Sequence, residues 1–242
     1  MIANRSSLLY QKVSEKGFRP SHVAEVGVWH PDTSNIYQYA QDGVRTTLVE
    51  PDPESISLIK SEFSGSGNVS LHEVALCDFN GKVELYKRAS STFVSVLSTS
   101  PALVNDDCDI QQTEKFTADA RLFSEIDDGT IELISIDTEG SEWFVIKNMR
   151  SRPTVISIET HGGMYVNPYL TDLLKWMREN NYVVWYKDAS DSVFVLRNTI
   201  PVLFADRIDL FKANFTISRR SGRLRLRKKL KQLFRRQVVL NK

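Results

Sequence analysis

Ile134-Ser-Ile-Asp-Thr-Glu-Gly-Ser-Glu142 joins an apolar segment to three acidic residues placed around one glycine. The apolar run that leads into it, residues 131–136, is typical of a buried parallel strand. In open α/β sheets, ligands bind just beyond the carboxyl ends of such strands. Because Asp137 directly follows the strand and Gly140 permits a tight turn, this segment predicts a functional site at the edge of a parallel sheet.

Short apolar segments of the same kind alternate with helical patterns along the chain. The predicted strands cover residues 23–28, 46–49, 69–76, 131–136, 154–158, 182–186 and 192–196. The predicted helices cover residues 32–40, 53–63, 118–126, 141–149 and 169–180. This order predicts a doubly wound, Rossmann-like α/β fold with a seven-stranded, mostly parallel sheet whose last strand is antiparallel.

Charge is divided unevenly between the two ends of the chain. Residues 219–242 contain 11 Lys or Arg residues and no Asp or Glu, which leaves 20 basic and 30 acidic residues in the remainder. We therefore expect an acidic domain over residues 1–200 and a C-terminal extension over residues 201–242 that ends in a basic amphipathic helix.

On a helix, five apolar residues of this extension would form one stripe. They are Leu226, Leu230, Leu233, Phe234 and Val238. The stripe either docks on the acidic domain or, through residues 219–242, contacts an anionic membrane surface.

The sequence shows no transmembrane or secretory signature. No apolar run approaches the ~20 residues that a membrane-spanning helix needs, and the N-terminus lacks the apolar core of a signal peptide. Cys77 and Cys108 have no CxxC spacing and are expected to be reduced. The expected location is the cytoplasm, with peripheral attachment to the inner face of the membrane if the C-terminal helix binds lipid.

Polar residues also mark the ends of the other predicted strands. Glu50 ends the second strand, where an acidic residue can accept hydrogen bonds from both hydroxyls of a ribose. Gly27 ends the first strand and lets its turn approach a ligand closely. The segment Gly27-Val-Trp-His-Pro31 has no further glycine and so lacks the usual phosphate cradle. The predicted ligand is a nucleoside without phosphates.

This combination resembles the class I S-adenosylmethionine-dependent methyltransferases, and more narrowly the FkbM-type family. The motifs that carry the resemblance are Ala24-Glu-Val-Gly27, Leu48-Val-Glu-Pro-Asp52, Glu73-Val-Ala-Leu-Cys-Asp78 with Asn80-Gly81, Ile136-Asp-Thr-Glu-Gly-Ser-Glu142 and Ile156-Ser-Ile-Glu-Thr-His161. The resemblance implies S-adenosylmethionine as the cofactor. The residues predicted to bind it are Glu25, Gly27, Trp29, Glu50 and Asp78. The family's first motif generally has a second glycine close to Pro31, so Trp29 and His30 are expected over or beside the cofactor.

The predicted catalytic residues are Asp137, Glu139 and His161. Asp137 and Glu159 lie at neighbouring strand ends and can hold a hard divalent ion such as Mg²⁺. Related macrocin-type O-methyltransferases use a metal at corresponding strand ends. The alternative is that His161 or His30 acts as a general base, because imidazole titrates near neutral pH. The sequence leaves the ion open.

The resemblance implies O-methylation of a sugar or glycan hydroxyl, on an acceptor that can be lipid-linked. The Ser/Thr/Asp-rich segment 88–112, predicted to be a long loop, suits a polyol. One alternative is a methyltransferase fold that no longer catalyses and serves as a scaffold in glycan assembly. A less favoured alternative is nucleic-acid methylation, because the domain is acidic and has no Asn/Asp-Pro-Pro-aromatic motif for an extruded base.

Overall fold

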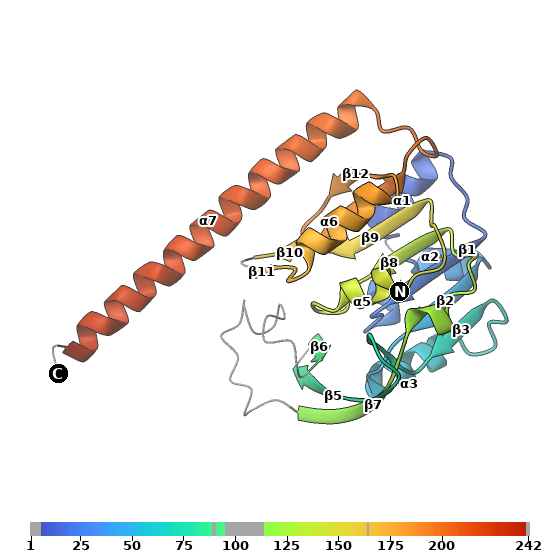
Figure 1. The fold of residues 1–242 in the computed structure, drawn as a ribbon, viewed down its shortest axis with the longest axis horizontal. Helices are drawn as coiled ribbons and strands as arrows, with labels where there is room; N and C mark the ends of the chain where they lie inside the picture. The colour runs from blue at the N-terminus through green and yellow to red at the C-terminus, as the bar shows by residue number, and fades with distance from the viewer. Residues whose placement is uncertain (1–5, 89–90, 95–113, 164, 241–242) are drawn as a thin grey trace.

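A seven-stranded sheet forms the centre of the chain, in a computed structural model that describes residues 6–88, 91–94, 114–163 and 165–240 (Figure 1). Its strands run in the order β12-β13-β9-β8-β1-β2-β3. They are β1 (His22–Val26), β2 (Arg45–Val49), β3 (Val69–His72), β8 (Leu133–Ile136), β9 (Val155–Glu159), β12 (Tyr182–Lys187) and β13 (Asp191–Leu196). β3, β2, β1, β8 and β9 are mutually parallel, and β13 is antiparallel to both of its neighbours. The predicted Rossmann-like sheet with an antiparallel last strand is confirmed.

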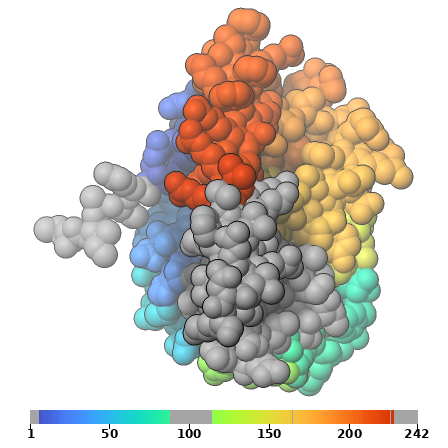
Figure 2. All heavy atoms as spheres, turned by 90° about the vertical axis from the view of Figure 1, so that its left-hand side faces the viewer, coloured from blue at the N-terminus to red at the C-terminus, as the bar shows by residue number. Residues whose placement is uncertain are grey.

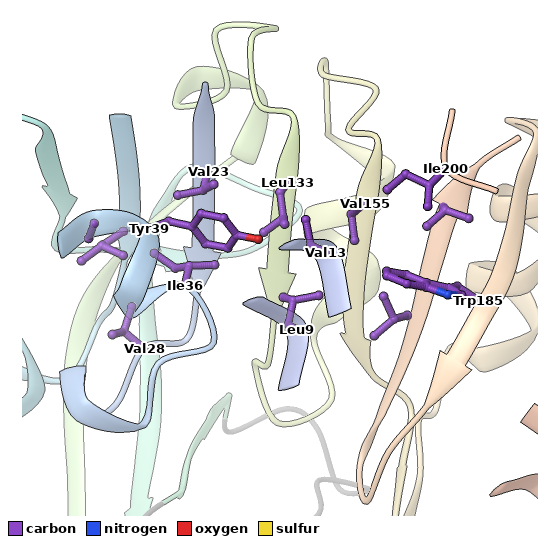
Figure 3. Packing of buried hydrophobic residues seen from close by; sticks show 14 of the residues in the cluster. Leu9, Val13, Val23, Val28, Ile36, Tyr39, Leu133, Val155, Trp185 and Ile200 are labelled. Carbon is purple, nitrogen blue, oxygen red and sulfur yellow. The ribbon is translucent and has the colours of Figure 1, made fainter. Parts of the chain in front are cut away.

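Helices cover both faces of this sheet. The first face carries α1 (Leu8–Glu15), α2 (Tyr37–Gln41) and α3 (Pro53–Glu62), and the second carries α5 (Glu142–Lys147) and α6 (Leu170–Glu179). Successive residues of a strand point to opposite faces. Val23 accordingly packs in the first cluster with Val13 and Tyr39 (Figure 3). Its neighbour Ala24 packs in the second cluster.

The start of α3 follows directly from the local sequence. The Asp52 carboxylate accepts hydrogen bonds from the backbone N–H groups of Glu54 (2.9 Å) and Ser55 (3.0 Å), and Pro53 occupies the first helical position. Such a cap contributes about 1 kcal/mol to stability. The predicted helix start is confirmed, and it fixes the path of the chain after β2.

A second sheet lies beside the first, with the order β4-β7-β5-β6. Its strands are β4 (Ala75–Leu76), β5 (Gly81–Arg88), β6 (Ser91–Val94) and β7 (Glu114–Arg121). Two predictions fail here. The predicted helix over residues 118–126 is wrong, because β7 pairs with β5 and only η3 (Phe123–Glu125) is helical. The predicted strand 69–76 is wrong in extent, because β3 ends at His72 and β4 joins the second sheet.

The predicted helix over residues 32–40 is also interrupted. The chain forms η1 (Pro31–Thr33) and then α2, which begins only at Tyr37. The residues between them contact β1 instead, since the Asn35 backbone N–H donates to the Glu25 carboxylate (2.9 Å). The predicted loop 88–112 overlaps the end of β5 at Arg88 and includes β6. Its other residues, with Cys108, lie outside the described residues.

One long helix, α7 (Phe204–Leu240), follows the sheet and extends past it in Figure 1, where it is orange to red. The helix predicted in the C-terminal extension is therefore present, and it begins at Phe204. Two polar contacts tie it to the domain. The Lys16 ammonium group pairs with Asp206 (2.8 Å), and the Ser221 hydroxyl donates to the carbonyl oxygen of Gly163 (2.8 Å). Across the described ranges, no helix has both the length and the apolar character that a membrane span requires.

Candidate functional site

An open pocket lies at the carboxyl ends of β1, β2 and β8. The strand order reverses between β1 and β8, and in doubly wound sheets such a reversal creates a ligand-binding crevice. Predicted site residues that line this pocket are Glu25, Gly27, Trp29, Glu50, Asp137 and Glu139. An apolar wall of the pocket comes from the second sheet and the residue before β4. It consists of Val74, Ala75, Leu76 and Leu85. No local pattern in the sequence indicates this wall, because it forms only when the two sheets come together.

Glu50 supports the turn that follows β1. One of its carboxylate oxygens accepts hydrogen bonds from the backbone N–H groups of Val28 (2.8 Å) and Trp29 (2.9 Å), and the other accepts one from Asp52 (3.0 Å). A carboxylate has about four acceptor positions, so three are occupied and one is left for a ligand. Burial raises the pKa of Glu50, and the three N–H donors oppose that shift.

Trp29 has an unusual backbone conformation. Its φ of 51° lies in the left-handed region, which bulky residues rarely adopt, and its side chain is 42% exposed. The hydrogen bond from its backbone N–H to the Glu50 carboxylate holds the residue in place. Strained backbone of this kind concentrates at functional sites. The ring lines the pocket and also lies against His30, with ring centroids 4.7 Å apart.

Glu25 is buried on β1 beneath the pocket. It accepts hydrogen bonds from the Ser34 hydroxyl and the Asn35 backbone N–H, while the Asn35 side chain donates to Ser135 on β8 (3.0 Å). Burial raises the pKa of Glu25 to about 7. Its contacts fix the segment between β1 and α2, which forms one side of the pocket.

A cluster of carboxylates lies where β8 and β9 end. Ligand oxygens of Asp137, Glu142 and Glu159 lie within 4.8 Å of one another. Asp137 opens to the pocket, but protein surrounds it on its other sides, and this loss of hydration together with the charge of Glu139 raises its pKa well above the usual range. Burial, and next the charge of Asp137, raise the pKa of Glu159. Crowded acidic groups of this kind favour shared protons or a bound cation.

Glu142 shapes this cluster by holding the preceding loop. One carboxylate oxygen accepts the backbone N–H groups of Thr138 and Gly140, each at 3.0 Å. The other accepts the Asn167 side-chain amide at 2.5 Å. Ser141 precedes α5, but its hydroxyl donates to the Thr138 carbonyl oxygen (3.1 Å) and does not cap the helix. Glu142 therefore holds the loop before α5.

Two residues of the site were missed from the sequence. Asn167 joins Glu142 to the carbonyl oxygen of Glu159 (3.2 Å), and Tyr165 is buried near the same carboxylates. Both lie in or just after the hairpin of β10 (His161–Gly162) and β11 (Tyr165–Val166), which folds back over the end of β9. The Gly162-Gly163 pair was the only local sign of that turn.

His161 and Asp78 lie outside the residues that line this pocket. The His161 ring contacts the Thr160 hydroxyl through Nδ1 (2.9 Å) and the Asp188 carbonyl oxygen through Nε2 (3.3 Å). The carbonyl can only accept, so Nε2 carries the hydrogen. Burial lowers the pKa of His161, and its ring lines a separate groove beneath α7. Asp78 is exposed and pairs with Lys147 (3.2 Å).

The oxygen atoms of this cluster suit a positively charged group. One carboxylate oxygen of Glu159 and the hydroxyl oxygen of Tyr165 are buried and have no hydrogen-bond partner among the described residues. Buried polar atoms normally have partners, so an acceptor left open beside Asp137 fits a cation or a shared proton. The sulfonium of S-adenosylmethionine and a hard divalent ion both meet that requirement.

The chain matches one family model over more than half of its length. A family model described as "Methyltransferase FkbM domain" matches residues 21–184. No curated protein matches the chain significantly. Similar solved structures include the ribosomal protein L11 methylase of Lactobacillus delbrueckii subsp. bulgaricus, at 10% identity over 77% of this chain and 74% of that one, with a TM-score of 0.42.

Two further solved structures are similar at low identity. M. capricolum TrmK, in complex with S-adenosyl-homocysteine, is 12% identical over 80% of this chain and 70% of that one, with a TM-score of 0.40. The glycopeptide N-methyltransferase MtfA is 6% identical over 77% of this chain and 87% of that one, with a TM-score of 0.41.

Proposed function

This chain belongs to the FkbM methyltransferase family, and on that premise we propose that it transfers the methyl group of S-adenosylmethionine to a hydroxyl oxygen of a sugar or glycan. The observation that carries the proposal is the meeting of two features in one place. A pocket at the reversal of the strand order, with Glu50 at its side, is lined by Asp137, which belongs to the carboxylate cluster with the buried Glu142 and Glu159.

Glu50 and Trp29 are the proposed cofactor-binding groups. The free acceptor position on Glu50 can take a hydrogen bond from a ribose hydroxyl, and the Trp29 ring offers an aromatic surface beside it. Gly27 and Glu25 would shape the floor of the same pocket. S-adenosylmethionine supplies a methyl group that its sulfonium already activates. The protein then has to bind and orient the acceptor and remove its proton.

Asp137 is the proposed general base. It opens to the pocket, and a carboxylate with a raised pKa accepts a hydroxyl proton more readily than one with an ordinary pKa. The transferred methyl forms a C–O bond as the C–S bond breaks, and the hydroxyl proton goes to Asp137. The negative charge of Glu139, which also raises the pKa of Asp137, favours the positively charged cofactor over its neutral product.

The acceptor is tested directly with isotopically labelled methyl donor. The full chain is incubated with labelled S-adenosylmethionine and with sugars, glycans or lipid-linked glycans, and mass spectrometry locates the label. The proposal expects label on a sugar oxygen. Label on a peptide nitrogen, or on RNA in preference to every glycan, would overturn the choice of acceptor.

A divalent ion is the second proposed use of the cluster. Asp137 and Glu159 supply oxygen ligands that Mg²⁺ accepts, and an ion there would lower the pKa of an acceptor hydroxyl. Methyl transfer is compared with and without EDTA and after Mg²⁺ or Mn²⁺ is restored. Loss of methyl transfer in EDTA, followed by recovery when Mg²⁺ or Mn²⁺ is added, assigns the ion to these carboxylates. Full activity in EDTA assigns them electrostatic and acid–base roles alone.

A further inference from the structure

The helix α7 has two apolar faces, and only one of them contacts the domain. The inward residues, spaced three or four apart, are half-buried: Asp206, Leu210, Ala213, Ile217, Ser221 and Leu224. Asp206 and Ser221 make the polar contacts that hold this face in place. Ala213 and Ile217 line the groove that also contains His161. The inward face therefore needs no further partner.

The outward face carries an unusual row of exposed apolar side chains. Phe204 is 78% exposed, Phe211 73% and Phe215 61%, and Ile208 between them is 41% exposed. Their spacings of four, three and four place them on one side of the helix. Leu226, which is 60% exposed, follows about three helical turns after Phe215 on the same side. Exposed aromatic residues in such a row mark an interaction surface.

Basic residues flank this row and dominate the rest of the helix. Lys212, Arg219 and Arg223 are exposed beside it. From residue 219 onward the chain has 11 Lys or Arg residues and no acidic residue. Figure 2 looks from the side toward which α7 extends, and the described part of the helix (orange to red) is a ridge there. Figure 1 shows the C-terminal end of α7 well away from the sheet.

We propose that the outward face of α7 binds the surface of an anionic lipid bilayer, with Phe204, Ile208, Phe211 and Phe215 inserted shallowly and the basic residues at the headgroups. An apolar stripe bordered by Lys and Arg is the pattern of an interfacial helix. A second copy of the chain is a poorer partner. If it packed its own α7 against this face, the two runs over residues 219–242, which contain no acidic residue, would bring like charges together.

Vesicle co-sedimentation of the full chain tests this surface without any methyl donor, so its outcome is independent of the proposed reaction. The probes are phosphatidylcholine vesicles with and without phosphatidylglycerol. We expect binding only when phosphatidylglycerol is present, and weaker binding at high salt. Each basic residue near an anionic surface strengthens binding by about fivefold. Absence of binding by the parent chain overturns the proposal.

Two double variants separate the apolar and the basic parts. Phe211→Ala with Phe215→Ala should weaken vesicle binding by at least roughly tenfold. Arg219→Glu with Arg223→Glu should weaken it by more than that. The matched controls are Leu58→Ala with Leu174→Ala, which removes other exposed apolar side chains, and Lys175→Glu with Arg178→Glu, which makes the same charge change on α6.

The controls should bind as the parent does, and circular dichroism should show that every variant is folded. Equal binding by the parent and the Phe variant contradicts the proposal. Sedimentation velocity tests the alternative that the partner is a second copy of the chain. If the parent is a dimer that dissociates in the Phe variant, and the parent does not bind vesicles, the face binds a second copy and the lipid proposal is overturned.

Discussion

Gly27 and Asp137 approach each other so closely that no side chain fits between them. A Cβ atom built on Gly27 would lie 1.7 Å from the backbone carbonyl oxygen of Asp137. The two residues end the adjacent parallel strands β1 and β8, where the Asp137 N–H donates to the carbonyl oxygen of Val26 (2.9 Å). This contact places the turn after β1 beside the loop that follows β8. The pocket and the carboxylate cluster are therefore adjacent.

Gly27→Ala should therefore destabilise the domain severely. The added methyl group meets backbone, which cannot move aside, and the φ of 82° disfavours any side chain. We expect the free energy of unfolding in urea to fall by about 3 kcal/mol or more. Gly43→Ala is the matched control, because Gly43 has a φ of 81° and open space around it, and should cost only about 1 kcal/mol. Equal losses in the two variants would contradict the account of this contact.

Asp137→Asn should lower turnover without a matching loss of cofactor affinity. The amide keeps the shape of the side chain but cannot accept the hydroxyl proton. Loss of a general base costs about a hundredfold or more in kcat. Affinity for S-adenosylhomocysteine, measured by calorimetry, should stay within about threefold of the parent. Asp172→Asn on α6 is the control and should leave both quantities unchanged. Full turnover by Asp137→Asn would remove it from the chemistry.

Glu159→Gln should flatten the dependence of stability on pH. Burial and Asp137 raise the pKa of Glu159 in the folded state, whereas the unfolded chain releases this proton near pH 4.5. Above that pH the unfolded state binds fewer protons than the folded state, so stability falls by up to ~1.4 kcal/mol per pH unit for one such group. Removing Glu159 removes this loss.

The measurement is urea unfolding between mildly acidic and mildly alkaline pH. Glu159→Gln should gain stability over the parent as the pH rises. Glu84→Gln, at an exposed position of β5, should follow the parent at each pH. If the free energy of unfolding of the parent and of the Glu159 variant changed with pH in the same way, burial would not raise the pKa of Glu159.

Trp29→Gly should separate stability from binding. Glycine adopts the left-handed backbone of this position without strain, which offsets its greater freedom in the unfolded chain, so the free energy of unfolding should stay within ~1 kcal/mol of the parent. Loss of the aromatic surface should weaken binding of S-adenosylhomocysteine by about tenfold. Asn198→Gly, at an exposed left-handed position away from the pocket, should bind normally. Unchanged affinity of the Trp29 variant would place the cofactor elsewhere.

Local signals in the sequence predicted much of the fold. Apolar runs identified every strand of the main sheet, and Asp52-Pro53 identified the start of α3. Ser7 caps α1 through a bond from the Tyr10 N–H (3.1 Å), but that helix is short and was not predicted. β7 was assigned to a helix because its strand character comes from pairing with β5, a partner distant in the chain.

The site was predictable where it lies at strand ends. Gly27, Glu50 and Asp137 follow three strands of one sheet, so parallel topology alone brings them to one edge. Asn167 and Tyr165 reach the same edge through a hairpin that folds back, and no local pattern encodes that path. The cofactor-binding role of Asp78 rests on the family resemblance, and the catalytic role of His161 rests on its position after a predicted strand and on imidazole chemistry. Both stay predictions.

We propose that the pocket between β1, β2 and β8 binds S-adenosylmethionine. Calorimetric titration of S-adenosylhomocysteine into the parent chain and into Glu50→Gln measures this binding. We expect saturable binding of one ligand per chain by the parent. We expect affinity at least about tenfold weaker in the variant, because an amide cannot accept every hydrogen bond that the carboxylate accepts. A folded parent that binds no S-adenosylhomocysteine, or a variant that binds it as tightly as the parent does, would contradict it.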